Sequence, residues 1–251
     1  MPSINIVRHS QIVKTARVIQ CQSLFDIPPS ETSQSVWNVN FELPQEWNIG
    51  LIVGPSGAGK STVAKELFGD QFAPEWQWSM DKSLLDGFPQ NMGIKEITEI
   101  LSSVGFSSPP AWMKPHHVLS NGEQFRVNMA RTLAEMPEMC VVDEFTSVVD
   151  RTVAQIGSHA ISKAVRKRNQ KFVAVTCHYD VAEWLEPDWI YQPHTGEFIS
   201  GRSLRRPQIT LQIKRVKHTA WELFRKLWQE EADASPTMYQ WLKENIHNDK
   251  A

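Results

Sequence analysis

Residues 51–62 of the 251-residue chain read LIVGPSGAGKST. Three apolar residues lead into three glycines, a lysine and two adjacent hydroxyl side chains. Glycines let backbone N–H groups turn inward toward phosphate oxygens without a Cβ clash, and a helix N-terminus adds favourable partial charge. The spacing from Gly54 to Ser61 fits G-x-x-x-x-G-K-[ST] at every fixed position. The stretch therefore predicts a buried strand, a phosphate-binding loop and a helix, in that order.

Each residue type in this loop has a chemical reason to be there. Lys60 would reach the β- and γ-phosphates of a nucleotide, and the Ser61 hydroxyl would be a ligand of Mg²⁺. The alternative is a glycine-rich turn without a ligand, which the preceding strand and following helix disfavour. The predicted ATP-binding residues of the loop are Gly54, Pro55, Ser56, Gly57, Ala58, Gly59, Lys60, Ser61 and Thr62.

A second apolar run, residues 139–142, ends in two carboxylates. Asp143 stands where a phosphate-loop enzyme places the acid that holds Mg²⁺. Glu144 would then polarise an attacking water as general base. Taken alone, a strand that ends in two ordinary surface acids would explain the pattern equally well.

The stretch LSNGEQFRVNMARTL, residues 119–133, resembles the signature of ATP-binding-cassette (ABC) ATPases, usually written L-S-G-G-Q and followed by a helix. Asn replaces the first glycine and Glu replaces the glutamine; Asn tolerates left-handed backbone geometry better than most residues. The resemblance implies that the signature of one copy closes over the γ-phosphate bound by a second copy. The signature residues are Ser120, Asn121, Gly122 and Glu123.

Further elements follow in the order of that family. DEFTSVVD, residues 143–150, resembles the family's D-E-P-T-S-A-L-D, which makes Ser147 and Asp150 part of the D-loop. VAVTCHYD, residues 173–180, resembles the strand that leads to the switch histidine, here His178. With Lys60 and Glu144, this histidine completes the catalytic set that the resemblance implies.

Two further assignments leave alternatives open. By the same correspondence, Phe25 lies near the position of the aromatic side chain that stacks on adenine, although a role in the core is also open for it. The Q-loop residue is either Asp86 or Gln90, in LLDGFPQ (84–90). The interval between Lys60 and the signature is short, which implies a reduced helical subdomain.

The order of patterns predicts an α/β fold with a mostly parallel sheet. The resemblance implies a P-loop NTPase of ABC type with antiparallel N-terminal strands, a reduced helical subdomain and a small C-terminal α/β extension. The expected domains are an ATPase domain over 1–200, with the helical subdomain and signature in 68–135, and a basic, aromatic extension over 201–251. Expected strands are 16–25, 36–43, 49–53, 139–142 and 172–176, and expected helices are 61–67, 94–104, 123–135 and 151–168.

Composition narrows the class of protein. The chain has 26 Lys and Arg against 28 Asp and Glu, a net charge of -2, so no global basic excess demands nucleic acid. Three widely spaced cysteines form no C-x-x-C pair, which favours a reduced, cytoplasmic compartment. No run of about 18 apolar residues predicts a membrane span, and the N-terminus does not read as a signal peptide.

The expected function is binding and hydrolysis of ATP with Mg²⁺ in a head-to-tail homodimer that drives or gates a partner protein or a nucleic-acid machine. The alternatives are the ATPase subunit of a membrane ABC transporter, a slow nucleotide-dependent clamp, and a P-loop kinase. Nucleic acid would bind a basic stretch, which a solvated charged face explains equally well. Its residues are Arg202, Arg205, Arg206, Lys214, Arg215 and Lys217.

Overall fold

The structure, a computed structural model, describes residues 4–25, 27 and 32–201. These residues lie within the first of two units of the chain, Met1–Arg205. The expected C-terminal extension and its basic residues lie outside the described residues. The boundary after residue 200 therefore stays a prediction.

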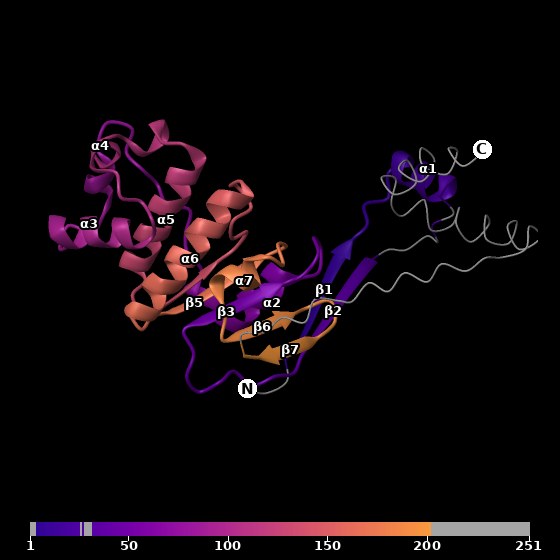
Figure 1. The fold of residues 1–251 in the computed structure, drawn as a ribbon. Helices are drawn as coiled ribbons and strands as arrows, with labels where there is room; N and C mark the ends of the chain where they lie inside the picture. The colour runs from indigo at the N-terminus through magenta and orange to yellow at the C-terminus, as the bar shows by residue number, and fades with distance from the viewer. Residues whose placement is uncertain (1–3, 26, 28–31, 202–251) are drawn as a thin grey trace, which may run out of the picture. The chain divides into compact units, whose positions relative to one another are not determined.

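The main sheet has five strands in the order β4-β5-β3-β6-β7 (Figure 1). The central strand β3 (Ile49–Val53) pairs in parallel with β5 (Lys171–Thr176) on one side and β6 (Trp189–Gln192) on the other. β4 (Met139–Val142) extends the parallel part, and β7 (Glu197–Ser200) closes the other edge antiparallel to β6. The predicted α/β class with a mostly parallel sheet is confirmed.

The N-terminal strands form a separate antiparallel pair. β1 (Ile4–Gln11) pairs with β2 (Thr32–Val39) along its whole length, so antiparallel N-terminal strands are present. Their positions differ from those predicted: β1 was not predicted, and the strand predicted over 36–43 begins and ends four residues earlier. The strand predicted over 16–25 is wrong, because α1 (Ala16–Leu24) is a helix. The Thr15 hydroxyl caps it by accepting a hydrogen bond from the Val18 N–H at 3.3 Å. Its apolar residues recur every third position, which is a helical spacing.

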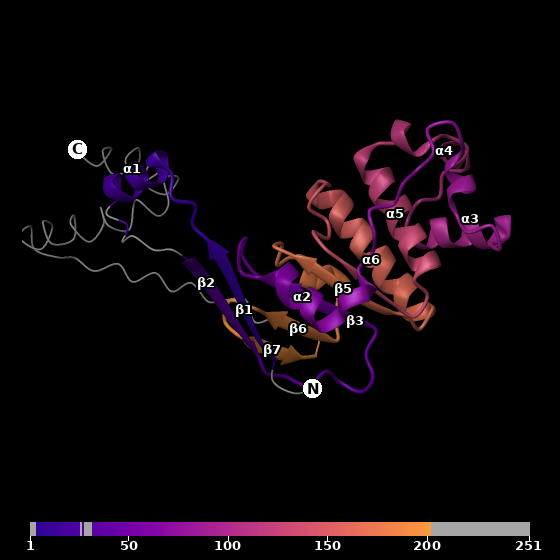
Figure 2. The same ribbon diagram turned by 180° about the vertical axis from the view of Figure 1, so that it is seen from behind.

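Some of the remaining helices pack on the main sheet, and others form a group beside it. Figures 1 and 2 both show α3, α4 and α5 gathered together, with α6 next to them. Within the described residues, no helix combines the length and apolar character needed to cross a membrane. The bounds are α2 (Lys60–Phe68), η1 (Gly69–Gln71), η2 (Leu84–Gly87), α3 (Ile94–Ser103), α4 (Pro109–Trp112), η3 (His116–Val118), α5 (Asn121–Glu135), α6 (Arg151–Lys167) and α7 (Val181–Leu185).

Two hydrophobic clusters pack on the two faces of the sheet. Along β3, Ile49, Leu51 and Val53 enter a cluster with residues of α3, α5, α6 and α7. Ile52 points the opposite way and packs with Val63 of α2 and with residues of β1 and β2. This alternation follows from the two-residue period of a strand. These four residues of β3 are fully buried, which explains why the strand reads as a continuous apolar run.

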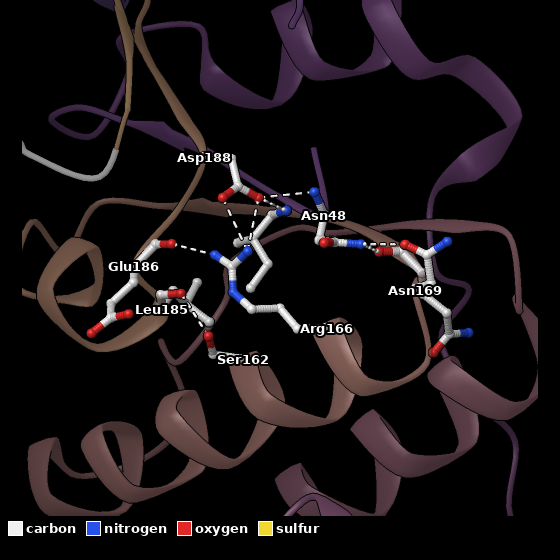
Figure 3. A network of polar contacts seen from close by, with 9 residues as sticks. Asn48, Ser162, Arg166, Asn169, Leu185, Glu186 and Asp188 are labelled. Carbon is white, nitrogen blue, oxygen red and sulfur yellow. Dashed lines mark hydrogen bonds and ion pairs between the residues drawn. The ribbon is translucent and has the colours of Figure 1, made fainter. Parts of the chain in front are cut away.

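A polar network braces the sheet edge at the start of β3 and β6 (Figure 3). The Asp188 carboxylate accepts hydrogen bonds from the N–H groups of Asn48 and Ile49 at 2.8 and 3.0 Å, and pairs with Arg166 at 3.0 Å. The Asn48 amide donates to the carbonyl of Gln170 at 3.0 Å. Burial opposes the charged form of Asp188, but these backbone donors and the guanidinium outweigh it and hold the pKa of the carboxyl below its usual value.

Asp188→Asn is expected to lower the free energy of unfolding by about 1 to 3 kcal/mol at pH 7, because Arg166 loses its charged partner. The depressed pKa means that the carboxylate's contribution is complete above its unfolded pKa of about 3.9 and is lost as the pH falls through the lower folded value. Urea denaturation at pH 7 and pH 3 measures both effects. The difference in free energy of unfolding between wild type and variant should be smaller at pH 3 than at pH 7.

Glu99→Gln is the matched control for this change. Glu99 pairs with Lys167 at 3.4 Å, but the two side chains are 67% and 77% exposed. Solvent screening leaves such a pair worth little, so the control should lie within about 0.5 kcal/mol of wild type. A gap for Asp188→Asn of equal size at both pH values would contradict the linkage to the carboxylate.

Candidate nucleotide-binding site

The loop between β3 and α2 has the backbone shape that the sequence pattern demands. Gly57 and Gly59 have φ values of 77° and 83°, in the left-handed region that glycine adopts without strain. Lys60 opens α2, is 7% exposed, and donates from Nζ to the Pro55 carbonyl at 2.8 Å. The lysine ammonium therefore lies across the loop, with the N-terminus of α2 beside it.

A hydroxyl of this loop meets the first acid that follows β4. The Ser61 Oγ donates to Asp143 Oδ1 at 3.0 Å, across 82 positions of sequence. The Glu144 N–H donates to the same carboxylate oxygen at 3.0 Å. A hydroxyl and a carboxylate oxygen are hard ligands of the kind that Mg²⁺ prefers. The two predicted metal ligands are thus together, and their donor set fits Mg²⁺.

The second acid after β4 lies in a strained turn. Glu144 has a φ of 50° and Thr146 a φ of 67°, both unusual for residues with a side chain. The Ser147 hydroxyl donates to Glu144 Oε2 at 2.7 Å, so this predicted D-loop serine contacts the predicted base. Asp150, the other D-loop residue, caps α6 by accepting from two N–H groups at 3.0 Å. Strain of this kind is typical of functional sites.

His178 follows β5, which lies between β3 and β4 in the sheet. The carboxyl ends of these parallel strands meet at one edge, so the histidine lies at the same edge as the loop and the two acids. It is half-buried, and its backbone N–H donates to the Thr176 hydroxyl at 3.2 Å. Its role toward a phosphate stays a prediction.

The signature forms the start of α5. Ser120 and Glu123 make a capping box, in which the Ser120 hydroxyl accepts from the Glu123 N–H and the Glu123 carboxylate accepts from the Ser120 N–H at 2.9 Å. The Ser120 N–H and hydroxyl donate to this carboxylate and lower its pKa. Glu at this position therefore serves the helix start. Asn121 is the first residue of the helix, and Gly122 lies against Val153 of α6.

A cavity of about 930 Å³ lies between α5 and the end of β4. Its lining includes Asn121 of the signature together with Asp143 and Glu144. Neither Q-loop candidate lines it. Asp86 of η2 accepts a hydrogen bond at 2.6 Å from the hydroxyl of Ser83, the residue before this helix, and Gln90 lies beyond η2.

Phe25 ends α1 with its side chain 67% exposed. Among the contacts of the described residues, Phe25 touches neither the phosphate loop nor this cavity. Its assignment to adenine stays a prediction.

Sequence reasoning missed the segment that runs beside the acids. Phe72 bridges to Val141 of β4, and the Ala73 N–H donates to the Val141 carbonyl at 2.8 Å. The following residues, 73–76, line the cavity. The paired tryptophans of FAPEWQWS (72–79) were the available signal.

Two tryptophans tie this segment to α5. The indole N–H of Trp76 donates to Thr132 and that of Trp78 to Asn128, each at 2.9 Å. The Arg131 guanidinium lies between the two rings, 4.6 and 4.7 Å from their centroids. His116 stacks on Trp78, and burial lowers the pKa of that imidazole. We call residues 72–78 with these contacts the tryptophan strap.

Several curated ATP-binding proteins of transport systems are similar in sequence. The aliphatic sulfonates import ATP-binding protein SsuB 2 of Frankia alni is 30% identical over 156 residues, 54% of this chain and 61% of the relative. The energy-coupling factor transporter ATP-binding protein EcfA1 of Geobacillus kaustophilus is 26% identical over 68% of this chain and 74% of the relative. The chain thus spans about three fifths of the length of the first of these relatives. No family model matches the chain.

Solved structures share the fold. The post-hydrolysis dimer of the ATP-binding cassette MJ0796, bound to ADP and Pi, has a TM-score of 0.52 at 18% identity and covers 68% of this chain and 94% of that one. A bacterial Atm1-family ABC exporter with ATP bound has a TM-score of 0.50 at 19% identity, over 65% of this chain and 35% of that one. Taken with the phosphate loop, the paired acids and the signature, the sequence relatives support an ATP-binding-cassette nucleotide-binding domain, and the solved structures show that its fold is that of such cassettes.

Proposed function

We propose that this chain binds ATP with Mg²⁺ and hydrolyses it while two copies face each other head to tail. Lys60 and the loop amides hold the phosphates, and Ser61 with Asp143 holds Mg²⁺, which supplies neutralising charge at the phosphate oxygens. Glu144 holds the attacking water and takes its proton. His178 approaches the γ-phosphate from the end of β5.

The observation that carries this proposal is the 3.0 Å hydrogen bond between Ser61 and Asp143. A glycine-rich turn without a ligand needs no acid beside its hydroxyl, and an ordinary surface acid has no reason to lie there. The strained backbone at Glu144 adds a second carboxylate at the same edge, held by Ser147.

We further infer that the chain acts as the ATP-binding subunit of a membrane transporter, in preference to a nucleic-acid machine. The names of the sulfonate-import and energy-coupling-factor relatives support this choice, since both are ATP-binding proteins of transport systems. The basic residues between 202 and 217 lie outside the described residues and lend nucleic acid no structural support. The phosphotransfer of a P-loop kinase needs no signature helix.

Asp143→Asn tests the magnesium site of this proposal. We expect phosphate release to fall about 10- to 100-fold, because a neutral amide holds Mg²⁺ poorly, and the Mg²⁺ concentration needed for half-maximal rate to rise. Phosphate release by the purified chain, measured against Mg²⁺ concentration with EDTA as blank, checks both.

Asp70→Asn is the matched control, because Asp70 is an exposed acid of η1 with no part in the site. It should match wild type. Equal rates for Asp143→Asn and wild type would contradict the magnesium site. A rate that rises several-fold on addition of DNA or RNA would overturn the transporter assignment in favour of a nucleic-acid machine. A measurable but very low wild-type rate would favour the slow clamp.

A further inference from the structure

One tryptophan outside the family motifs lies against the phosphate loop. Trp37 belongs to β2, where it pairs with Ile6 of β1, and these strands share no backbone ladder with the main sheet. Its indole N–H donates to the Ala58 carbonyl at 2.9 Å, across 21 positions of sequence. The side chain is half-buried and packs on the cluster that also contains Val63 of α2.

The ring of Trp37 also lies directly on a loop glycine. A Cβ placed on Gly59 would come within 2.2 Å of the indole, closer than real contacts allow. Gly59 is therefore glycine for two reasons, its φ of 83° and the ring above it. The loop residue before the lysine has no room for a side chain while Trp37 is in place.

The hydrogen bond to Ala58 sets the direction of a neighbouring N–H. The Ala58 carbonyl and the Gly59 N–H belong to one planar trans peptide unit, so they point in opposite directions. When the indole holds the carbonyl on its own side, the Gly59 N–H is turned to the other side. The Gly59 carbonyl is held separately, by the Val63 N–H at 2.9 Å in the first turn of α2.

We propose that Trp37 is a positioning residue that holds the peptide between Ala58 and Gly59 in the orientation needed to bind a nucleotide phosphate. This inference rests on the proposed function, since it concerns the affinity of the same loop. Trp37 acts through the loop backbone and adds no group to hydrolysis. Its loss should therefore weaken nucleotide binding and raise KM while leaving kcat unchanged.

Trp37→Phe is the informative variant, because it keeps an aromatic ring in the same hydrophobic cluster and removes the indole N–H donor together with the part of the ring that covers Gly59. We expect the Kd for Mg·ADP, measured by isothermal titration calorimetry, to rise about three- to tenfold, the effect of one lost hydrogen bond. ADP is not consumed, so this measurement does not depend on turnover. The melting temperature without nucleotide should stay within about 2 °C of wild type.

Trp112→Phe is the matched control. Trp112 also donates its indole N–H to a backbone carbonyl, that of Phe106, at 3.0 Å, but within the helical group. Its removal should leave the Kd for Mg·ADP unchanged. An unchanged Kd for Trp37→Phe, or an equal rise in both variants, overturns the positioning role. A wild-type chain that binds no Mg·ADP overturns the proposed function itself, which separates the two failures.

Discussion

Lys60→Ala is expected to weaken nucleotide binding, with a Kd for Mg·ATP raised about 100-fold. Lys60 is 7% exposed and its ammonium lies 2.8 Å from the Pro55 carbonyl. Residues 51–62 contain no other basic side chain that could take its place. Charge-assisted hydrogen bonds to phosphate oxygens are the strong ones, worth about 1.5 to 3 kcal/mol each. Titration with a fluorescent ATP analogue measures the change.

Lys65→Ala provides the matched control for this lysine. Lys65 lies one turn further along α2, is exposed, and has its ammonium 5.8 Å from the Phe72 ring. It should bind nucleotide as wild type does. The melting temperature of Lys60→Ala has to be measured as well, because the substitution removes a buried side chain. Wild-type affinity in a folded Lys60→Ala protein would show that the loop does not bind phosphate.

Glu144→Gln is expected to bind ATP with near wild-type affinity and to hydrolyse it about 100- to 10,000-fold more slowly. The amide cannot take a proton from water, and general-base catalysis is worth about that factor. The proposed phosphate-binding groups lie on the loop and α2, so we expect ground-state binding to be retained. With ATP and Mg²⁺ present, the variant should remain a dimer in size-exclusion chromatography, while phosphate release measures the loss of turnover.

Glu138→Gln is the control, because Glu138 is an exposed acid just before the opposite end of β4. Its rate and elution should match wild type. A Glu144→Gln protein that turns over ATP normally would remove Glu144 from the role of base. One that binds ATP but stays monomeric would contradict hydrolysis between two copies and leave the base assignment intact.

The central strands and the loop could be predicted from sequence because local and tertiary signals agree there. Residues 49–53 are buried on both faces, so their continuous apolar run and their environment point to the same structure. The glycines of the loop are required by backbone conformation, which sequence states directly. Ser61 follows β3 and Asp143 follows β4, so the two residues come together once these strands lie parallel in one sheet.

Other parts depended on contacts that no local pattern reveals. Residues 16–25 mix apolar and polar side chains. Over only ten residues, the two-residue repeat of a strand is hard to tell from the three- to four-residue repeat of a helix. The place of Trp37 depends on how the β1–β2 pair lies against the loop, 21 positions away. The tryptophan strap likewise joins Trp76 to Thr132 across 56 positions, so its partners could not be read from neighbouring residues.

The tryptophan strap holds α5 at two points. These two points, Asn128 and Thr132, are one helical turn apart. The helix therefore cannot shift along its axis or rotate about it at this position without breaking both hydrogen bonds. Ser120 lies 8 and 12 residues away along the same rod, about 12 and 18 Å at 1.5 Å per residue. The strap is attached to β4 through Phe72 and Val141, next to the two acids that follow this strand. A small tilt of α5 at the strap would therefore produce a larger displacement at Ser120.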